Sequence, residues 1–486
     1  MKHREKEFAM NSLKAKGIAL GIALMGLSGF GLLSAQELTS RQISERNKPG
    51  TVMIITMYEA DVTVPEAELP QQSIAALQKK VTQLIQEGAV AHNQQAMLNA
   101  VWNELFTNPL KYLVPSEKHL QTKAKTGAQG SGFIITPDGY IVTNAHVVFK
   151  EEQMLKRMLA EGGLGTIISK DIEDIRKELG GQLTPEMEKL ATQGAATWYS
   201  HYMVIDNINR QIDTMMGVKL AGIPTLTQKF TADVRTMGKP TPGKDVAIIK
   251  IDRKDLPTIS LGDDTAMRAG DRVYVIGYPQ SESIQLLLAP ESQTETTLTS
   301  GLISARKTMA GGWDVLQTDT TINHGNSGGP AFNEKGEVIG IATFGAIDWS
   351  TGKEITGVNF LVPSSIIKQY LHEINVTPQQ SRLTRLYNEG LTSFERKHYS
   401  AALDKFREIN ELNPGYPYVQ AYITDSRAAK ERGEDVSTIP WLYILLGLGS
   451  LVAVGAVVGF MLRRRKGPPG KPTIIKKTEP PIKATA

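Results

Sequence analysis

The 486-residue chain contains no cysteine, and this absence removes several kinds of chemistry at once. Without thiols the protein can form no disulfide, no cysteine-based zinc site and no thiolate nucleophile. Any nucleophilic catalysis must therefore use a hydroxyl, an amine, an imidazole or a carboxylate.

A strong excess of one charge is also lacking, since the formal net charge is only +4. Residues 1–16 and 463–486 together hold 13 Lys/Arg and 3 Asp/Glu, so the rest of the chain is acidic, with a net charge of −6. Nucleic-acid binding domains concentrate basic residues on one face. The charge distribution therefore gives no indication of a nucleic-acid partner.

The most informative segment is a serine surrounded by small residues, at positions 323–330 (NHGNSGGP). Gly325 allows a sharp turn with backbone angles that other residues avoid. Such a turn can direct the N–H groups of Gly325 and Ser327 at one point, as an oxyanion hole requires. A glycine-rich surface turn with an incidental serine explains the pattern equally well, so the interpretation needs partner residues.

Candidate partners lie upstream of this serine. Residues 130–148 read as a β-hairpin with a Pro-Asp-Gly turn, and His146 follows at the end of the second strand. Asp245 stands at the start of a β-branched segment that is typical of a buried strand. Taken singly, the histidine could be a core residue and the aspartate a turn cap. The chain order histidine, aspartate, serine is nevertheless one of the known orders of a nucleophilic triad.

Together these segments resemble the HtrA/Deg branch of the trypsin-like serine proteases, with collinear motifs from about residue 130 to 370. The resemblance implies a mainly β fold of two six-stranded antiparallel β-barrels of chymotrypsin type, and it implies no cofactor. It assigns His146 as general base, Asp245 as its orienting acid and Ser327 as nucleophile, with Gly325 and Ser327 forming the oxyanion hole. Family members often form trimers, which makes a homo-oligomer an expectation, although no residue here identifies the contact.

The same resemblance suggests the substrate pocket. Thr321, six residues before the nucleophile, is neutral where trypsin has an aspartate that attracts basic side chains. The expected pocket wall at 357–361 contains Val358, Asn359 and Phe360 and would pair with an extended substrate. We expect cleavage after small or medium aliphatic residues.

Segments near both ends of the chain predict that the protease domain lies outside the cytoplasm. Basic residues followed by an apolar run indicate a signal peptide or N-terminal anchor over 1–35. Residues 439–462 carry no charge and are long enough for one transmembrane helix, followed by a basic tail at 463–486. The positive-inside rule places that tail in the cytoplasm and the protease outside. The expectation is a cell-membrane protein with a single C-terminal span.

Between these ends, the protease domain is expected over 36–375, opening with a strand at 51–57. Helical insertions are predicted at about 61–127 and 150–200. They could decorate the fold, gate the active site or bind a partner, and the sequence does not choose among these.

Residues 381–433 resemble one tetratricopeptide (TPR) repeat, an α-helical hairpin, where the family usually has PDZ modules. Gly390, Tyr399, Ala402, Phe406 and Pro414 occur at the spacing of that repeat. A plain helical spacer is equally compatible with the pattern. A TPR-like segment would offer a site for a protein partner.

The sequence thus predicts a membrane-tethered extracytoplasmic serine endopeptidase that cleaves unfolded or misassembled polypeptides. Two alternatives stay open. One is a non-catalytic membrane scaffold that binds partners through its helical insertions and TPR-like segment, and the other is a signalling protease with one specific client.

Overall fold

The computed structural model describes residues 37–218, 226–279, 295–347, 354–436 and 441–465. The predicted N-terminal signal or anchor at 1–35, and most of the predicted basic tail, lie outside these ranges.

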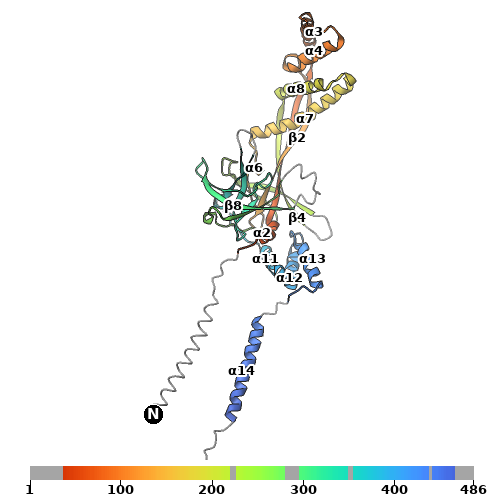
Figure 1. Cartoon of the computed structure of the whole chain (residues 1–486). Coiled ribbons are helices and arrows are strands. Elements are labelled where there is room, and N and C mark those ends of the chain that lie inside the picture. Colours follow the sequence, from red (N-terminus) through yellow and green to blue (C-terminus); the bar gives the residue numbers. More distant parts are fainter. Residues whose placement is uncertain (1–36, 219–225, 280–294, 348–353, 437–440, 466–486) are drawn as a thin grey trace, which may run out of the picture.

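Two closed six-stranded antiparallel barrels form the centre of the molecule (Figure 1). The first barrel has the strand order β1-β2-β3-β6-β5-β4 and the second β10-β11-β12-β9-β8-β7. The strands of the first are β1 (Thr51–Glu68), β2 (Val114–Ile134), β3 (Tyr140–Thr143), β4 (Val204–Val218), β5 (Leu226–Met237) and β6 (Ala247–Ile251). Those of the second are β7 (Arg272–Gly277), β8 (Thr297–Thr308), β9 (Asp314–Thr318), β10 (Pro330–Phe332), β11 (Val338–Ile347) and β12 (Glu354–Pro363).

A single apolar core joins the two barrels. Phe133 and Ile248 from the first barrel share a buried cluster with Phe332 and Val362 from the second. Each barrel also has its own interior cluster, built from inward-facing side chains that alternate along the strands. The barrels are therefore held against each other as one packed unit, and residues contributed from both sides can form a single site.

The strands β1 and β2 are much longer than the sequence interpretation allowed. The predicted strand stopped at residue 57 and an insertion was expected from about 61 to 127, but β1 continues to Glu68 and β2 starts at Val114. The sequence signal that was missed is an alternation of apolar residues beyond the predicted end, at Tyr58, Ala60, Val62 and Val64. All four are buried in the structure.

The long strands carry five helices to one end of the molecule, in a unit we call the head (Figure 1). The helices are α3 (Gln71–Gln86), α4 (Gln94–Thr107), α5 (Pro109–Tyr112), α7 (Glu152–Leu179) and α8 (Pro185–Tyr202). The indole of Trp198 in α8 is buried among Ile167 and Ile168 of α7 and Val64 of β1. The two expected insertions are thus parts of one body with its own core.

At the other side of the barrels, three helices form what we call the helical unit: α11 (Arg382–Glu395), α12 (Tyr399–Leu412) and α13 (Val419–Glu431). Gly390 allows α11 and α12 to cross closely, because a Cβ at this position would lie 2.8 Å from the Phe406 ring. An aromatic cluster of Tyr387, Phe406 and Tyr422 fills the space between the helices.

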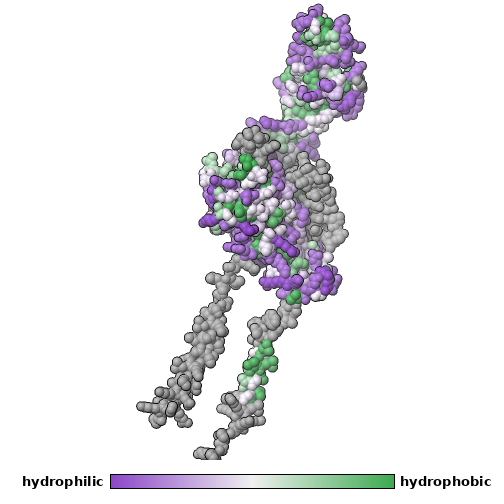
Figure 2. All heavy atoms as spheres, viewed as in Figure 1, coloured by the Kyte–Doolittle hydropathy of each residue, from purple (hydrophilic) through white to green (hydrophobic). Residues whose placement is uncertain are grey.

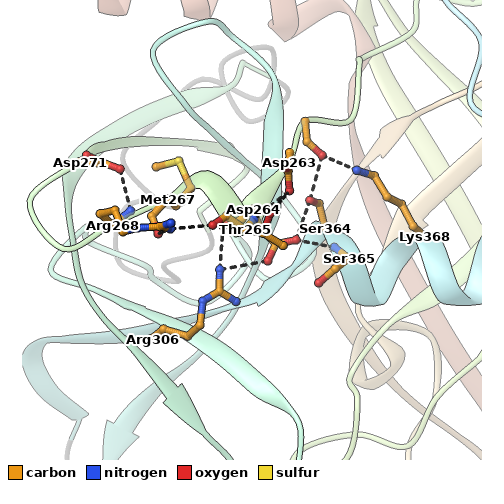
Figure 3. Close-up of polar contacts among 11 residues, drawn as sticks. Asp263, Asp264, Thr265, Met267, Arg268, Asp271, Arg306, Ser364, Ser365 and Lys368 are labelled. Carbon is orange, nitrogen blue, oxygen red and sulfur yellow. Dashed lines mark hydrogen bonds and ion pairs between the residues drawn. The ribbon is translucent and has the colours of Figure 1, made fainter.

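A buried aspartate fastens the second barrel to helix α10 (Ser364–Glu373), as Figure 3 shows. Asp264 is 1% exposed, and its Oδ1 accepts hydrogen bonds from the Ser365 backbone N–H at 2.7 Å and the Ser364 Oγ at 3.1 Å. Its Oδ2 lies 3.1 Å from the Arg306 guanidinium on β8. The Asp264 carboxylate therefore accepts hydrogen bonds from the first turn of α10 and also neutralises the charge of Arg306.

A long helix, α14 (Trp441–Arg465), forms where the membrane span was predicted, and Figure 2 shows hydrophobic residues along it. Within the described residues, however, no helix combines the length and the apolar character needed to cross a membrane. The predicted transmembrane helix over 439–462 is therefore not supported, and residues 439 and 440 lie outside the described ranges.

Candidate active site

Two neighbouring strands of the first barrel bring His146 and Asp245 together. His146 lies on the short helix α6 (Ala145–Val148), directly after β3, and Asp245 immediately precedes β6. Since β3 and β6 pair with Thr143 opposite Ala247, the two side chains meet at the same edge. The His146 Nδ1 lies 2.6 Å from the Asp245 Oδ2, and the His146 backbone N–H donates to Oδ1 at 2.9 Å. This contact assigns the proton to Nδ1 and leaves Nε2 as the basic nitrogen.

The Asp245 carboxylate is fully buried and well supplied with donors. Besides His146, the Thr343 Oγ1 donates to Oδ2 at 2.8 Å. Burial by itself raises the pKa of Asp245, but the hydrogen bonds and charge of His146 and the Thr343 hydroxyl outweigh it, so the pKa lies below its ordinary value. Asp245 is therefore ionised at neutral pH and can stabilise a protonated imidazole.

Ser327 enters the site from the second barrel, on the loop between β9 and β10. Its Oγ donates to the Thr343 carbonyl oxygen at 3.1 Å. Thr343 therefore contacts both Ser327, through its carbonyl, and Asp245, through its hydroxyl. The structure joins His146 to Asp245 directly and brings Ser327 to the pair through Thr343.

The backbone around Ser327 has the sharp turns that the glycines predict. Gly325 has φ +92° and Gly328 has φ +84°, both in the left-handed region that side chains disfavour. Ser131 on β2 holds this loop, because its Oγ donates to the Gly325 carbonyl at 2.6 Å and its N–H donates to the Ser327 carbonyl at 2.8 Å. Among the described residues, the N–H groups of Gly325 and Ser327 have no hydrogen-bond acceptor.

The residues predicted to bind substrate lie near this loop with different roles. Asn359 on β12 is buried, and its Nδ2 donates to the Thr320 carbonyl at 2.9 Å, which positions the neighbouring exposed Thr321. Val358 is half-buried, and the Phe360 ring stacks on Phe344 with centroids 4.9 Å apart. Asn359 thus holds the backbone beside Thr321, and substrate binding by these residues stays a prediction.

Three residues that the sequence interpretation missed support the site: Thr343, Ser131 and Asn144. Asn144 precedes His146, and its Nδ2 donates to the Asp245 carbonyl at 2.6 Å. All three are buried polar residues, with Ser131 in β2, Thr343 in β11 and Asn144 directly after β3, and buried polar side chains are usually engaged in hydrogen bonds. A polar residue within or directly after an apolar strand could have indicated a supporting role, but the partners of these residues are distant in sequence. Among the described residues, no group of three or more histidine, aspartate or glutamate side chains could hold a metal ion.

Comparison with known proteins gives a match over the region that contains all three residues. The family model described as "Trypsin-like peptidase domain" matches residues 130–341. A "Probable periplasmic serine endoprotease DegP-like" of Brucella suis biovar 1 (strain 1330) is 31% identical over 252 residues, which cover 51% of this chain and 33% of the relative. "Serine protease HTR4" of Rattus norvegicus is 27% identical over 333 residues, covering 64% of this chain and 48% of that protein. The chain thus spans about a third of the length of such bacterial relatives.

Solved structures that are similar to this chain include a serine endoprotease from Yersinia pestis, with 18% sequence identity and a TM-score of 0.32. That match covers 70% of this chain and 67% of the other.

Proposed function

We propose that the chain is a serine endopeptidase of the HtrA/DegP type that acts outside the cytoplasm, because the trypsin-like peptidase model matches residues 130–341 and a relative named as a periplasmic serine endoprotease is 31% identical over 252 residues. The observation that carries the proposal is the 2.6 Å contact between the His146 Nδ1 and the buried Asp245 carboxylate, linked through Thr343 to Ser327. A buried acid that fixes one imidazole nitrogen leaves the other free to act as a base.

In the proposed reaction, Ser327 turns its hydroxyl from the Thr343 carbonyl toward His146. The His146 Nε2 takes the proton while Oγ attacks the substrate carbonyl carbon. The resulting tetrahedral oxyanion accepts hydrogen bonds from the N–H groups of Gly325 and Ser327. Removal of one such donor typically lowers the rate by about 10²–10³.

Collapse of this intermediate breaks the peptide C–N bond, and the protonated His146 gives its proton to the departing amine. An acyl-enzyme on the Ser327 Oγ remains. A water molecule then attacks the acyl carbon while His146 accepts its proton, and His146 passes this proton to the Ser327 Oγ as the Oγ–acyl bond breaks, which releases the carboxylic acid and the free hydroxyl. The ionised Asp245 stabilises the imidazolium in both steps, which agrees with its lowered pKa.

The substrates we propose are unfolded or misassembled polypeptides, cut after small or medium aliphatic residues. Neutral Thr321 offers no charge to a basic side chain, and the stacked pair of Phe344 and Phe360 supports a restricted apolar pocket. An extended chain can pair with β12 near Val358, because the pairing of β12 with β9 covers only residues 359–361, and a folded substrate offers no such extended strand.

The extracytoplasmic location is proposed because the bacterial relative is named as periplasmic. We also infer that the helical unit is one TPR-like repeat covered by α13, since Gly390 and Phe406 pack as the repeat spacing requires. One such repeat is below the usual minimum of about three for independent stability, so packing on the barrels or on a protein partner must support it.

The test is covalent labelling of the full chain with a fluorophosphonate probe, which reacts with activated serines. We expect labelling at Ser327 that disappears in Ser327→Ala and falls steeply in His146→Ala. The matched control is Ser300→Ala, which removes an exposed serine on β8 outside the site and should leave labelling intact. Absence of labelling in the unmodified chain, or equal labelling in Ser327→Ala, would refute the proposal.

A further inference from the structure

The head contains a cavity of about 550 Å³ between α7, α8 and the outer part of β1 and β2. This volume falls within the range of about 300–1,000 Å³ that ligand sites usually have. Its apolar walls include Phe106, Leu120, Ile175 and Trp198. The cavity is separate from the active site, because its lining residues come from α4, α7, α8, Leu113 and the outer parts of β1 and β2.

Carboxylates are concentrated around this apolar space. Glu66, Asp171, Asp174 and Glu178 line it, against Lys170 as the single basic lining residue. Asp174 pairs with Lys177, whereas within the described part of the chain no ion pair forms to Glu66, Asp171 or Glu178. The cavity thus has apolar walls, and its four acidic lining residues outnumber its one basic lining residue.

Asp171 is the best placed of these acids to meet a ligand. It lies half-buried on the inner face of α7, close to the apolar residues Ile167, Ile168 and Ile172. The Tyr199 hydroxyl from α8 donates to its Oδ2 at 2.5 Å, which fixes the orientation of the carboxylate. Burial, with the charges of Asp174 and Glu66, raises the pKa of Asp171 despite the opposing effects of the Tyr199 hydrogen bond and the Lys170 charge. A cation brought in by a ligand would relieve this unfavourable environment.

We propose that the head cavity is a docking site for a polypeptide segment that carries apolar side chains beside lysine or arginine. The apolar walls would take up the hydrophobic side chain, and the carboxylates of Asp171, Asp174 and Glu178 would hold the neighbouring cation. Charge complementarity selects this occupant, because an acidic segment would add like charges to an already negative rim. Figure 2 shows hydrophilic and hydrophobic residues side by side over the head.

The experiment measures binding by fluorescence polarisation with a labelled decapeptide of alternating leucine and lysine. The full chain carries Ser327→Ala, so that the probe is not cut and the result does not depend on peptidase activity. The control probe alternates leucine and glutamate. We expect saturable binding of the basic probe that weakens with added salt, and much weaker binding of the acidic one.

Two variants locate the binding. The double variant Asp174→Asn with Glu178→Gln changes exposed residues, so it should fold normally, and we expect affinity to fall about three- to tenfold. Ala195→Trp places bulk in the cavity from α8 and should weaken binding at least as much. Glu117→Gln, an exposed acid on β2 outside the cavity, is the matched control and should leave affinity unchanged.

Thermal unfolding confirms that each variant is folded. Equal affinity for the two probes would overturn the proposal. So would unchanged affinity in the cavity variants, since the basic probe would then bind elsewhere, for example at the protease cleft.

Discussion

Ser131 connects the two barrels at the point where the nucleophile must be held. Its hydroxyl donates to the Gly325 carbonyl and accepts from the Tyr278 N–H at 2.9 Å, so both hydrogen-bonding functions are used inside the protein. Its backbone contacts the Ser327 carbonyl as well. The Gly325 carbonyl shares its peptide plane with the Asn326 N–H, which donates to the Asn323 carbonyl at 3.0 Å, so these bonds together fix the turn that lies between the Gly325 and Ser327 N–H groups. Ser131 is therefore a positioning residue for the loop.

We expect Ser131→Ala to slow fluorophosphonate labelling of Ser327 by about ten- to a hundredfold, because small displacements of reacting groups are costly. The global fold should survive, since the change removes one buried hydroxyl. The matched control is Ser426→Ala, which removes another buried hydroxyl, in the helical unit, where it makes no hydrogen bond to the described residues. Labelling rates measured alongside thermal unfolding separate the effects, and an unchanged rate would contradict the positioning role.

At the residue scale the sequence predicted the candidate catalytic residues but not the hydrogen bonds that position them. His146, Asp245 and Ser327 follow from their motifs, and the structure joins the first two through the short helix α6 and the start of β6. Thr343 was missed because its role depends on two atoms facing two partners, 98 and 16 positions away. Local patterns do not encode such distant contacts. The roles of the three residues in catalysis stay predictions until labelling tests them.

At the scale of elements, hydrophobic periodicity predicted some strands of the first barrel and missed part of another. The hairpin of β2 and β3 was predicted from its apolar runs and Pro-Asp-Gly turn. The outer half of β1 was missed, because polar residues alternate there with the buried ones that pack under α7. Which helix covers a strand depends on tertiary packing, so the assembly of two distant insertions into one head could not be predicted from either segment alone.

The pair of β4 and β5 contains an acid that makes the barrel sensitive to low pH. Asp213 on β4 is buried to 3% exposure and lies 2.9 Å from the Lys229 ammonium on β5. Burial alone raises the pKa of Asp213, but the hydrogen bonds from Lys229, Gln211 and Thr231 and the charge of Lys229 lower it below the ordinary 3.8. A pKa lowered by folding adds stability above the ordinary value, and this contribution is lost as the pH falls through the folded value.

We therefore expect the free energy of unfolding to fall steeply below about pH 4 and the Asp213→Asn variant to show a weaker dependence in that range. Above that range the variant should be less stable than the unmodified chain, because Lys229 loses its buried partner. Denaturant unfolding at several pH values measures both effects. Asp233→Asn, an exposed aspartate on β5, is the control and should leave the profile unchanged. Parallel profiles for Asp213→Asn and the unmodified chain would contradict the expectation.

Across the whole molecule, a few specific contacts attach the helical unit to the barrels. Helix α2 (Ser40–Asn47) contacts it through a hydrogen bond from the Gln42 side chain to Glu395, at 2.8 Å, and through the Tyr422 hydroxyl, which donates to Glu45. A second attachment is buried beneath the barrel, where Thr258 meets the start of α11. A unit of three helices has little core of its own, so these contacts decide whether it unfolds with the protease or separately.

Thr258 carries most of the hydrogen bonding at that second attachment. Its N–H donates to the Thr384 Oγ1 at 2.8 Å, and its own Oγ1 accepts from the Ser381 N–H at 2.7 Å. The side chain is 5% exposed, so water cannot replace a lost partner easily. Thr258→Val keeps the shape and leaves the Ser381 N–H buried without an acceptor, which costs about 1–3 kcal/mol.

Because that N–H lies at the N-cap of α11, Thr258→Val weakens the attachment of the helical unit to the barrels and leaves the hydrophobic core of each intact. We expect thermal unfolding of Thr258→Val to separate into two transitions, with the helical unit unfolding first. Calorimetry gives the transitions, and fluorophosphonate labelling after the first one shows whether the protease remains folded. Thr424→Val, on the exposed face of α13, is the control for the same substitution and should leave unfolding unchanged. A single transition, shifted as a whole, would mean that α2 and the barrel surface suffice to couple the two parts.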